Sequence, residues 1–139
     1  MNILGHVGVN VPDLELATRV FGDGLGFEVG WRSSVSDPQG DSMQRWLGLN
    51  SDAEGRFTFF RAGSGVEIEA IEWNRQSRNR GTLAADHGSH LALWIDDLDA
   101  TVGKLAGLGC TIYDPHSSGF VYARTSWGQY LQLMPKSQG

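Results

Sequence analysis

The chain of 139 residues contains a single cysteine, Cys110, so it cannot form an internal disulfide. A fold without disulfides depends on packing and is typical of a reducing compartment. Basic residues are also scarce, because 11 Lys and Arg stand against 16 Asp and Glu and leave a formal charge of −5. Proteins that bind nucleic acid need an excess of positive charge to neutralise phosphates. We therefore expect no nucleic-acid partner.

Long hydrophobic runs are missing as well. No apolar stretch approaches the roughly 20 residues that a membrane span requires, and the first residues lack the charged-then-apolar pattern of a secretory signal. We therefore expect a cytoplasmic protein without membrane association. Hydrophobic residues make up 40% of the chain, which is enough to build a buried core. This composition favours one folded domain over residues 1–139 and argues against disorder.

The sequence repeats itself. His6 and His90 each begin a short stretch of alternating apolar residues, and each is followed seven residues later by Asp-Leu. The stretch Gly-Val-Glu-Ile-Glu-Ala that begins at Gly65 recurs as Gly-Gln-Tyr-Leu-Gln-Leu from Gly128. Cys110 falls at an apolar position of the repeat, so it is expected to be buried rather than nucleophilic. The chain therefore consists of two related halves.

Each half is expected to fold as βαβββ. The alternating residues at 6–11 and 90–95 have strand periodicity, and the Asp that follows each stretch is a candidate helix N-cap. Glycines end both helices, and three further short strands follow in each half. The expected fold class is α+β with two tandem βαβββ modules. The modules are expected at residues 1–73 and 89–139, joined by a polar linker at 74–88.

One His and one oxygen donor in each half lie on the strand face opposite the apolar one. His6 and His90 alternate with apolar residues that point toward the helix, so both imidazoles point away from it. Glu69 and Gln132 stand between apolar neighbours, and by parity they leave the apolar face as well. If a pseudo-twofold axis brings the four together, they form a site for one divalent ion such as Zn, Ni, Co, Mn or Fe(II). The alternative is two structural histidines with solvated neighbours.

These stretches resemble the vicinal oxygen chelate superfamily, which includes glyoxalase I, extradiol dioxygenases and bleomycin-resistance proteins. The resemblance implies that the paired modules form a half-open, barrel-like sheet cleft with a metal in it, and that the protein is a homodimer. It extends over nearly the whole chain. The segments that carry it are residues 5–14, 65–70, 88–98 and 127–133.

The resemblance also implies a ligand set, with one departure from the usual pattern. Its four ligand positions fall on His6, Glu69, His90 and Gln132. The fourth position is normally a glutamate, and Gln132 can coordinate through its carbonyl oxygen but cannot accept a proton at neutral pH. Glu69 is therefore the expected catalytic base. Glu67, on the same strand face, is a second candidate.

Apolar and aromatic side chains are expected to line the substrate site. If the turn at residues 63–64 is a two-residue hairpin loop, Phe60 shares the face of Glu69. Trp94 shares the face of His90, and Tyr130 shares that of Gln132. An insertion in the first half supplies a candidate lid. The predicted substrate-binding residues are Met43, Trp46, Phe60, Trp94 and Tyr130.

The leading hypothesis is a metal-dependent lyase or isomerase of the glyoxalase type. Its substrate is a small molecule, partly aromatic or apolar, whose two adjacent oxygens chelate the metal. Two alternatives stay open. His6, His90 and Glu69 form the 2-His-1-carboxylate set of non-haem Fe(II) oxygenases, which leaves a ring-cleaving extradiol-type dioxygenase possible. A protein resembling the bleomycin-resistance members would instead bind an aromatic drug without catalysis.

Overall fold

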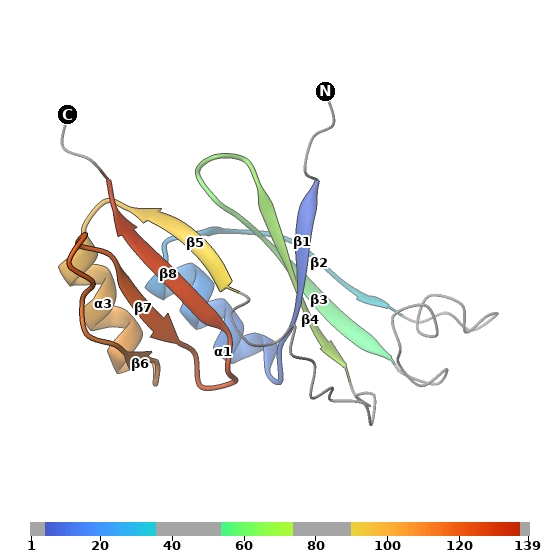
Figure 1. Cartoon of the computed structure of the whole chain (residues 1–139). Helices are drawn as coiled ribbons and strands as arrows, with labels where there is room; N and C mark the ends of the chain where they lie inside the picture. Colours follow the sequence, from blue (N-terminus) through green and yellow to red (C-terminus); the bar gives the residue numbers. More distant parts are fainter. Residues whose placement is uncertain (1–4, 36–53, 74–89, 137–139) are drawn as a thin grey trace. The chain divides into compact units, whose positions relative to one another are not determined.

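The computed structural model describes residues 5–35, 54–73 and 90–136 (Figure 1). The chain divides into two compact units, Met1–Thr82 and Leu83–Gly139. The expected linker at 74–88 lies outside the described residues, so the module boundaries stay a prediction. The expected lid residues Met43 and Trp46 also lie outside them.

The first unit is a four-stranded sheet with one helical segment. The strand order is β1-β4-β3-β2, with β1 parallel to β4 and the other neighbours antiparallel. The helix continues from α1 into a π-helical turn, η1, before the chain enters β2. The elements are β1 (His6–Asn10), α1 (Leu14–Thr18), η1 (Arg19–Gly24), β2 (Glu28–Val35), β3 (Gly55–Arg61) and β4 (Glu67–Trp73).

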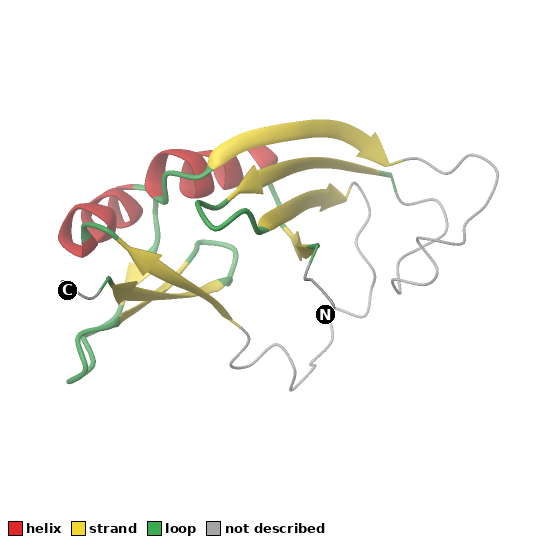
Figure 2. Ribbon diagram, turned by 90° about the horizontal axis from the view of Figure 1, so that it is seen from above, coloured by secondary structure: helices red, strands yellow, loops and turns green. Residues whose placement is uncertain are grey.

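The second unit repeats this plan. Its strand order is β5-β8-β7-β6, and the single parallel pair again joins its first and last strands. The elements are β5 (His90–Ile95), α3 (Leu98–Gly107), β6 (Thr111–Ile112), β7 (Val121–Arg124) and β8 (Tyr130–Pro135). Figure 2 shows the strands in yellow and the helices in red. The α+β fold with two tandem βαβββ modules is therefore confirmed, while the cleft that the two modules would form together stays a prediction.

Local signals set where the helices begin. The Asp13 carboxylate accepts hydrogen bonds from the backbone N–H groups of Glu15 (2.9 Å) and Leu16 (3.3 Å). Asp97 accepts one from the N–H of Ala100 at 3.0 Å. Each carboxylate satisfies backbone donors that have no partner inside the helix, so both predicted N-caps are confirmed. No helix in the described ranges is long and apolar enough to cross a membrane.

Each helix covers one face of its own sheet. In the first unit α1 packs on β3 and β4, and the fully buried ring of Phe21 lies 5.3 Å from that of Phe60, centroid to centroid. In the second unit α3 packs on β8, where Leu105, Leu131 and Leu133 are fully buried. Burial of each such side chain contributes about 1.5–3 kcal/mol.

The opposite face of the first sheet carries a second buried apolar cluster, formed by Phe57, Ile71 and Trp73 with Phe59 packed against it. Polar side chains, among them that of Glu69, share this face with the cluster.

The hairpin loop between β3 and β4 contains three residues, not two. The Ala62 N–H donates to the carbonyl of Val66 at 3.0 Å, and the Gly65 N–H donates to the carbonyl of Ala62 at 2.9 Å. Gly65 has a φ of +88°, the left-handed conformation that this kind of loop requires at its last position. The corresponding loop of the second unit has the same form, with Gly128 at +97°.

The extra loop residue reverses the expected parity of β3. Phe59 pairs with Glu69, whereas Phe60 pairs with Ile68 and is fully buried against the helix. The prediction that Phe60 lines the substrate site is therefore wrong, because it assumed a two-residue loop. A shift of one residue moves every side chain of a strand to the other face. Phe59 takes the place expected for Phe60.

Candidate metal and substrate site

His6 and Glu69 share the open face of the first sheet. Gly8 is the register partner of Glu69, and His6 stands two residues earlier on the same face of β1. Gly8 has no side chain, and Oε1 of Glu69 lies 4.0 Å from the point that a Cβ at this position would occupy. His6 is exposed and Glu69 is half-buried. Gly8 thus leaves room for one imidazole and one carboxylate to reach a common ligand.

An aromatic ring stands against His6. The centroids of the His6 and Phe59 rings are 5.3 Å apart, and the rings meet edge to face at 85°. Phe59 is half-buried, and its register partner on β4 is Glu69. Such an edge-to-face contact restricts the orientation of the imidazole on an otherwise exposed strand.

The second unit contains the same arrangement. Ala92, another small residue, pairs with Gln132, and exposed His90 stands two residues earlier on the same face. The ring of Tyr122 meets that of His90 edge to face, with centroids 5.7 Å apart at 84°. Tyr122 is also the partner of Gln132 across β7 and β8. Each unit therefore presents one imidazole, one oxygen donor and one aromatic ring at equivalent positions.

The donor chemistry of the four residues fits a divalent metal, but each unit by itself holds only two of them. Two imidazole nitrogens, one carboxylate and one amide oxygen suit a borderline ion such as Zn or Mn and leave coordination positions for substrate. Within the described ranges, no group of three or more His, Cys, Asp or Glu is close enough to hold a metal. The site at His6, Glu69, His90 and Gln132 requires both units and stays a prediction.

The other expected wall residues of the second unit lie on the face of His90. Trp94 is 65% exposed and pairs with Met134. Tyr130 is half-buried between two neighbours: the Tyr113 ring stacks on it at 6.4 Å, and the Arg124 guanidinium lies 5.3 Å from its centroid. Trp94 and Tyr130 therefore stand where substrate contact is possible, and their role stays a prediction.

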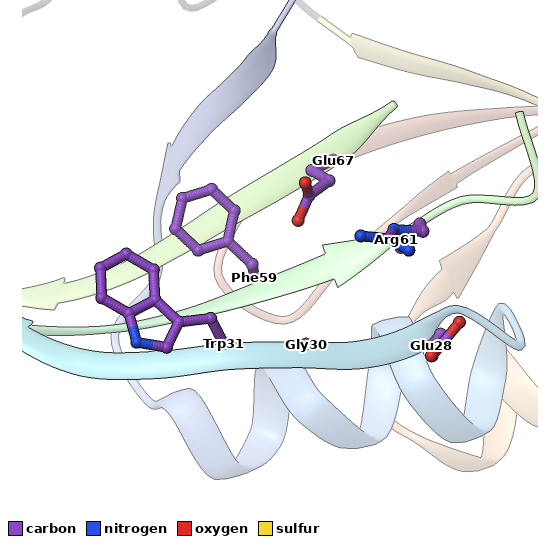
Figure 3. Close-up of a pocket in the computed structure, with 6 residues that line it drawn as sticks. All are labelled: Glu28, Gly30, Trp31, Phe59, Arg61 and Glu67. Atoms are coloured by element: carbon purple, nitrogen blue, oxygen red, sulfur yellow. The ribbon is translucent and has the colours of Figure 1, made fainter. Parts of the chain in front are cut away.

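A pocket of about 310 Å³ opens beside Phe59 and Glu67 (Figure 3). By strand register these two residues share the face of His6 and Glu69. Trp31 and Phe59 lie on one side of the pocket, and charged groups lie on the other. We call this cavity the Trp31 pocket; its lining residues are Glu28, Gly30, Trp31, Phe59, Arg61 and Glu67.

Sequence reasoning missed Phe59, Tyr122 and Trp31. For the first two, a signal was present, because a glycine at the last position of a three-residue loop predicts the observed parity. For Trp31 there was none. A β-bulge between Val29 and Arg32 turns its side chain onto the open face, and bulges leave no reliable mark in a single sequence.

Known proteins share this architecture. The chain is 30% identical over 141 residues to a 2-epi-5-epi-valiolone epimerase from Actinomyces sp., and the match covers 93% of this chain and 76% of that protein. A glyoxalase family protein from Bacillus cereus has a TM-score of 0.72 at 18% identity, with 94% of this chain and 91% of that chain covered.

A variant of the fosfomycin resistance protein FosX from Listeria monocytogenes, solved with Mn(II) and 1S,2S-dihydroxypropylphosphonic acid, is also similar. Its TM-score is 0.64 at 16% identity, with 96% of this chain and 90% of that chain covered. At these identities the solved structures show the fold alone. A family model, however, matches residues 5–122 directly. In agreement with the duplicated βαβββ units and the resemblance in the sequence, the chain belongs to the Glyoxalase/Bleomycin resistance protein/Dioxygenase superfamily.

Proposed function

We propose that this protein is a metal-dependent epimerase, which moves a proton at a carbon next to a carbonyl group. The observation that carries the proposal is the duplicated pair of donors, His6 with Glu69 and His90 with Gln132, at equivalent register positions. The relative named as an epimerase, 30% identical, supports isomerase chemistry over the lyase and dioxygenase alternatives.

A divalent ion held by the four donors would supply Lewis-acid chemistry, which polarises a carbonyl and acidifies the neighbouring C–H bond. Glu69 is the only carboxylate among the four. It accepts the proton when the C–H bond breaks, and the bond's electron pair passes to the carbonyl oxygen. The product forms when that carbon takes a proton from solvent water on its opposite face, and Glu69 returns its own proton to solvent. Gln132 stays neutral throughout and would hold the ion through its carbonyl oxygen.

The neighbours of Glu69 suit this task. Phe59, its cross-strand partner, is half-buried and places an apolar side chain beside Glu69 on the same face of the sheet. Gly8 leaves the space in front of it open, so a reacting carbon can approach within hydrogen-bond reach of the carboxylate. Substitution of Glu69 therefore removes the base without removing the wall around it.

The experiment is proton exchange in D2O with 2-epi-5-epi-valiolone as the first substrate, because the similar epimerase is named for it. Protein is stripped by a chelator, reloaded with Mn, Co or Zn, and followed by proton NMR. We expect loss of the C–H signal next to the carbonyl together with growth of the epimer's signals. Glu69→Gln at matched metal content should lower the rate by about 100-fold or more.

Glu72→Gln is the matched control, since Glu72 lies on β4 with the opposite parity and pairs with Arg56. This variant should catalyse proton exchange of the substrate at the wild-type rate. Several results would overturn the proposal: full activity after metal removal, full activity of Glu69→Gln, oxygen consumption with ring cleavage, or tight binding of an aromatic drug without any turnover.

The proposal includes a symmetric homodimer acting on a small molecule. Members of the vicinal oxygen chelate superfamily are often dimers, and the sheets of both units end in edge strands that pairing can cover. Sedimentation at micromolar concentration should give twice the 15.2 kDa chain mass. A monomer under these conditions would refute this part of the proposal.

A further inference from the structure

Charged side chains form a row across the open face of the first sheet. Arg61 on β3 is the cross-strand partner of Glu28 on β2 and of Glu67 on β4. Glu67 in turn is the register partner of His6 on β1. The row therefore leads from the Trp31 pocket directly to a proposed metal ligand.

The three charged groups of the pocket are not engaged with one another. Within the described part of the chain, no side-chain hydrogen bond or ion pair is formed by Arg61, Glu28 or Glu67. Arg61 and Glu28 are exposed, and Glu67 is half-buried. One guanidinium donor and two carboxylate acceptors are thus available to a ligand in the pocket.

A flat aromatic surface lies beside these charged side chains. The Trp31 ring stacks on Phe59 with centroids 5.9 Å apart at 16°, and Phe57 braces it edge to face at 4.9 Å. Trp31 is nevertheless 66% exposed, so part of the indole is open to solvent. Gly30 lies close to the neighbouring strand, since a Cβ there would be 3.3 Å from the carbonyl oxygen of Phe59.

The second unit lacks such a subsite at the equivalent positions. Its sequence counterparts of Arg61 and Glu67 are Arg124 and Tyr130, and there the guanidinium lies over the phenol ring, 5.3 Å from its centroid. Both units kept the arginine, but only the first surrounds it with carboxylates. This difference points to a ligand-binding role of the first unit's row that the fold itself does not require.

We infer that the Trp31 pocket binds a neutral polyhydroxylated ring, with the ring's C–H face on Trp31 and its hydroxyls on Arg61, Glu28 and Glu67. A purely apolar ligand would bury the three charges without partners, which costs binding energy. A phosphorylated ligand would meet two carboxylates for one guanidinium. A neutral polyol supplies donors and acceptors for both signs. This inference rests on the proposed function, in which the same ring would present its carbonyl near His6 and Glu69.

The test measures binding rather than turnover, so it stands apart from the exchange experiment. The probe is myo-inositol, added to chelator-treated protein and followed by saturation-transfer NMR, with circular dichroism to verify folding. We expect saturable binding that Arg61→Ala weakens by about 10-fold or more, as for loss of a hydrogen bond from a charged group. Trp31→Ala should weaken it as well, and Arg61→Lys should weaken it less than Arg61→Ala.

The matched control is Arg56→Ala, an exposed arginine on the same strand with opposite parity, whose partner is Glu72. It should bind myo-inositol as the wild type does. Absence of binding, equal binding by Arg61→Ala, or tighter binding of an inositol phosphate would overturn the inference. If inositol binds as expected but no proton exchange occurs, the pocket assignment stands and the proposed function fails.

Discussion

The edge of the Phe59 ring meets the imidazole of His6, with centroids 5.3 Å apart and planes at 85°. Tyr122 meets His90 in nearly the same geometry, at 5.7 Å and 84°. Two modules of different sequence thus both place an aromatic ring against the histidine on the open face of their first strand. This pairing depends on the strand register. The hairpin loops that set the register therefore also decide which ring lies against each proposed ligand.

Alanine variants of Phe59 and Phe60 should separate an effect on metal binding from an effect on stability. Phe60→Ala removes a fully buried ring and should lower the free energy of unfolding by about 3–5 kcal/mol. Phe59→Ala removes a half-buried ring on the open face, so its loss of stability should be smaller while the metal affinity falls. Urea unfolding of both variants measures the two losses of stability. Equal losses of stability would show that the two faces are assigned wrongly.

The hairpin glycines offer a test of the register. Gly65→Ala forces a Cβ into the left-handed region and should cost about 1–2 kcal/mol of stability. Gly63→Ala, in the same loop without positive φ and with open space around it, should change stability much less. Thermal unfolding of the pair gives the comparison. A larger loss for Gly63→Ala would contradict the three-residue loop.

Metal binding should depend on both modules. The double variant His6→Ala with His90→Ala removes both imidazoles and should lose stoichiometric Mn, Co or Zn in elemental analysis after dialysis. His116→Ala is the control, because His116 is not one of the four repeated donor positions. Its imidazole stacks on Phe120 and accepts a hydrogen bond from the Ser118 N–H. Retention of one ion per chain by the double variant would disprove the ligand set.

Gln132→Glu tests the unusual ligand. The substitution restores the commoner glutamate, and a second carboxylate should keep or tighten the metal, since an anionic oxygen binds a divalent cation more strongly than an amide oxygen does. Competition with a fluorescent chelator measures the affinity. A marked loss of metal would indicate that Gln132 does not face the ion.

Cys110 should be unreactive in the folded protein. Burial raises the pKa of its thiol, so at neutral pH even less of it is the reactive thiolate than in an exposed cysteine. Iodoacetamide labelling should therefore be slow in buffer, accelerate only above the ordinary thiol pKa, and become fast in denaturant. Rapid labelling of native protein at pH 7 would show that the side chain is accessible.

The predictions that the structure confirms rest on signals from residues that lie close together in the sequence. The His-to-Asp spacing that recurs in both halves gave the two βαβββ modules, and Asp13 and Asp97 cap the helices that follow. The buried position of Cys110 followed from its place in the repeat. Such signals involve only a few residues of one element, so a single sequence contains them.

The sequence alone determined the duplicated fold and the four candidate donors, because periodicity and the internal repeat record which face of an element is apolar, and its resemblance to a known superfamily indicated the family. The tertiary structure decided which aromatic side chains join those donors, and for Trp31 the sequence alone contained no signal. A three-residue loop placed Phe59, not Phe60, beside His6, and a bulge turned Trp31 into the pocket. One extra residue in a loop or strand changes composition hardly at all, yet it reverses the side to which every following side chain points.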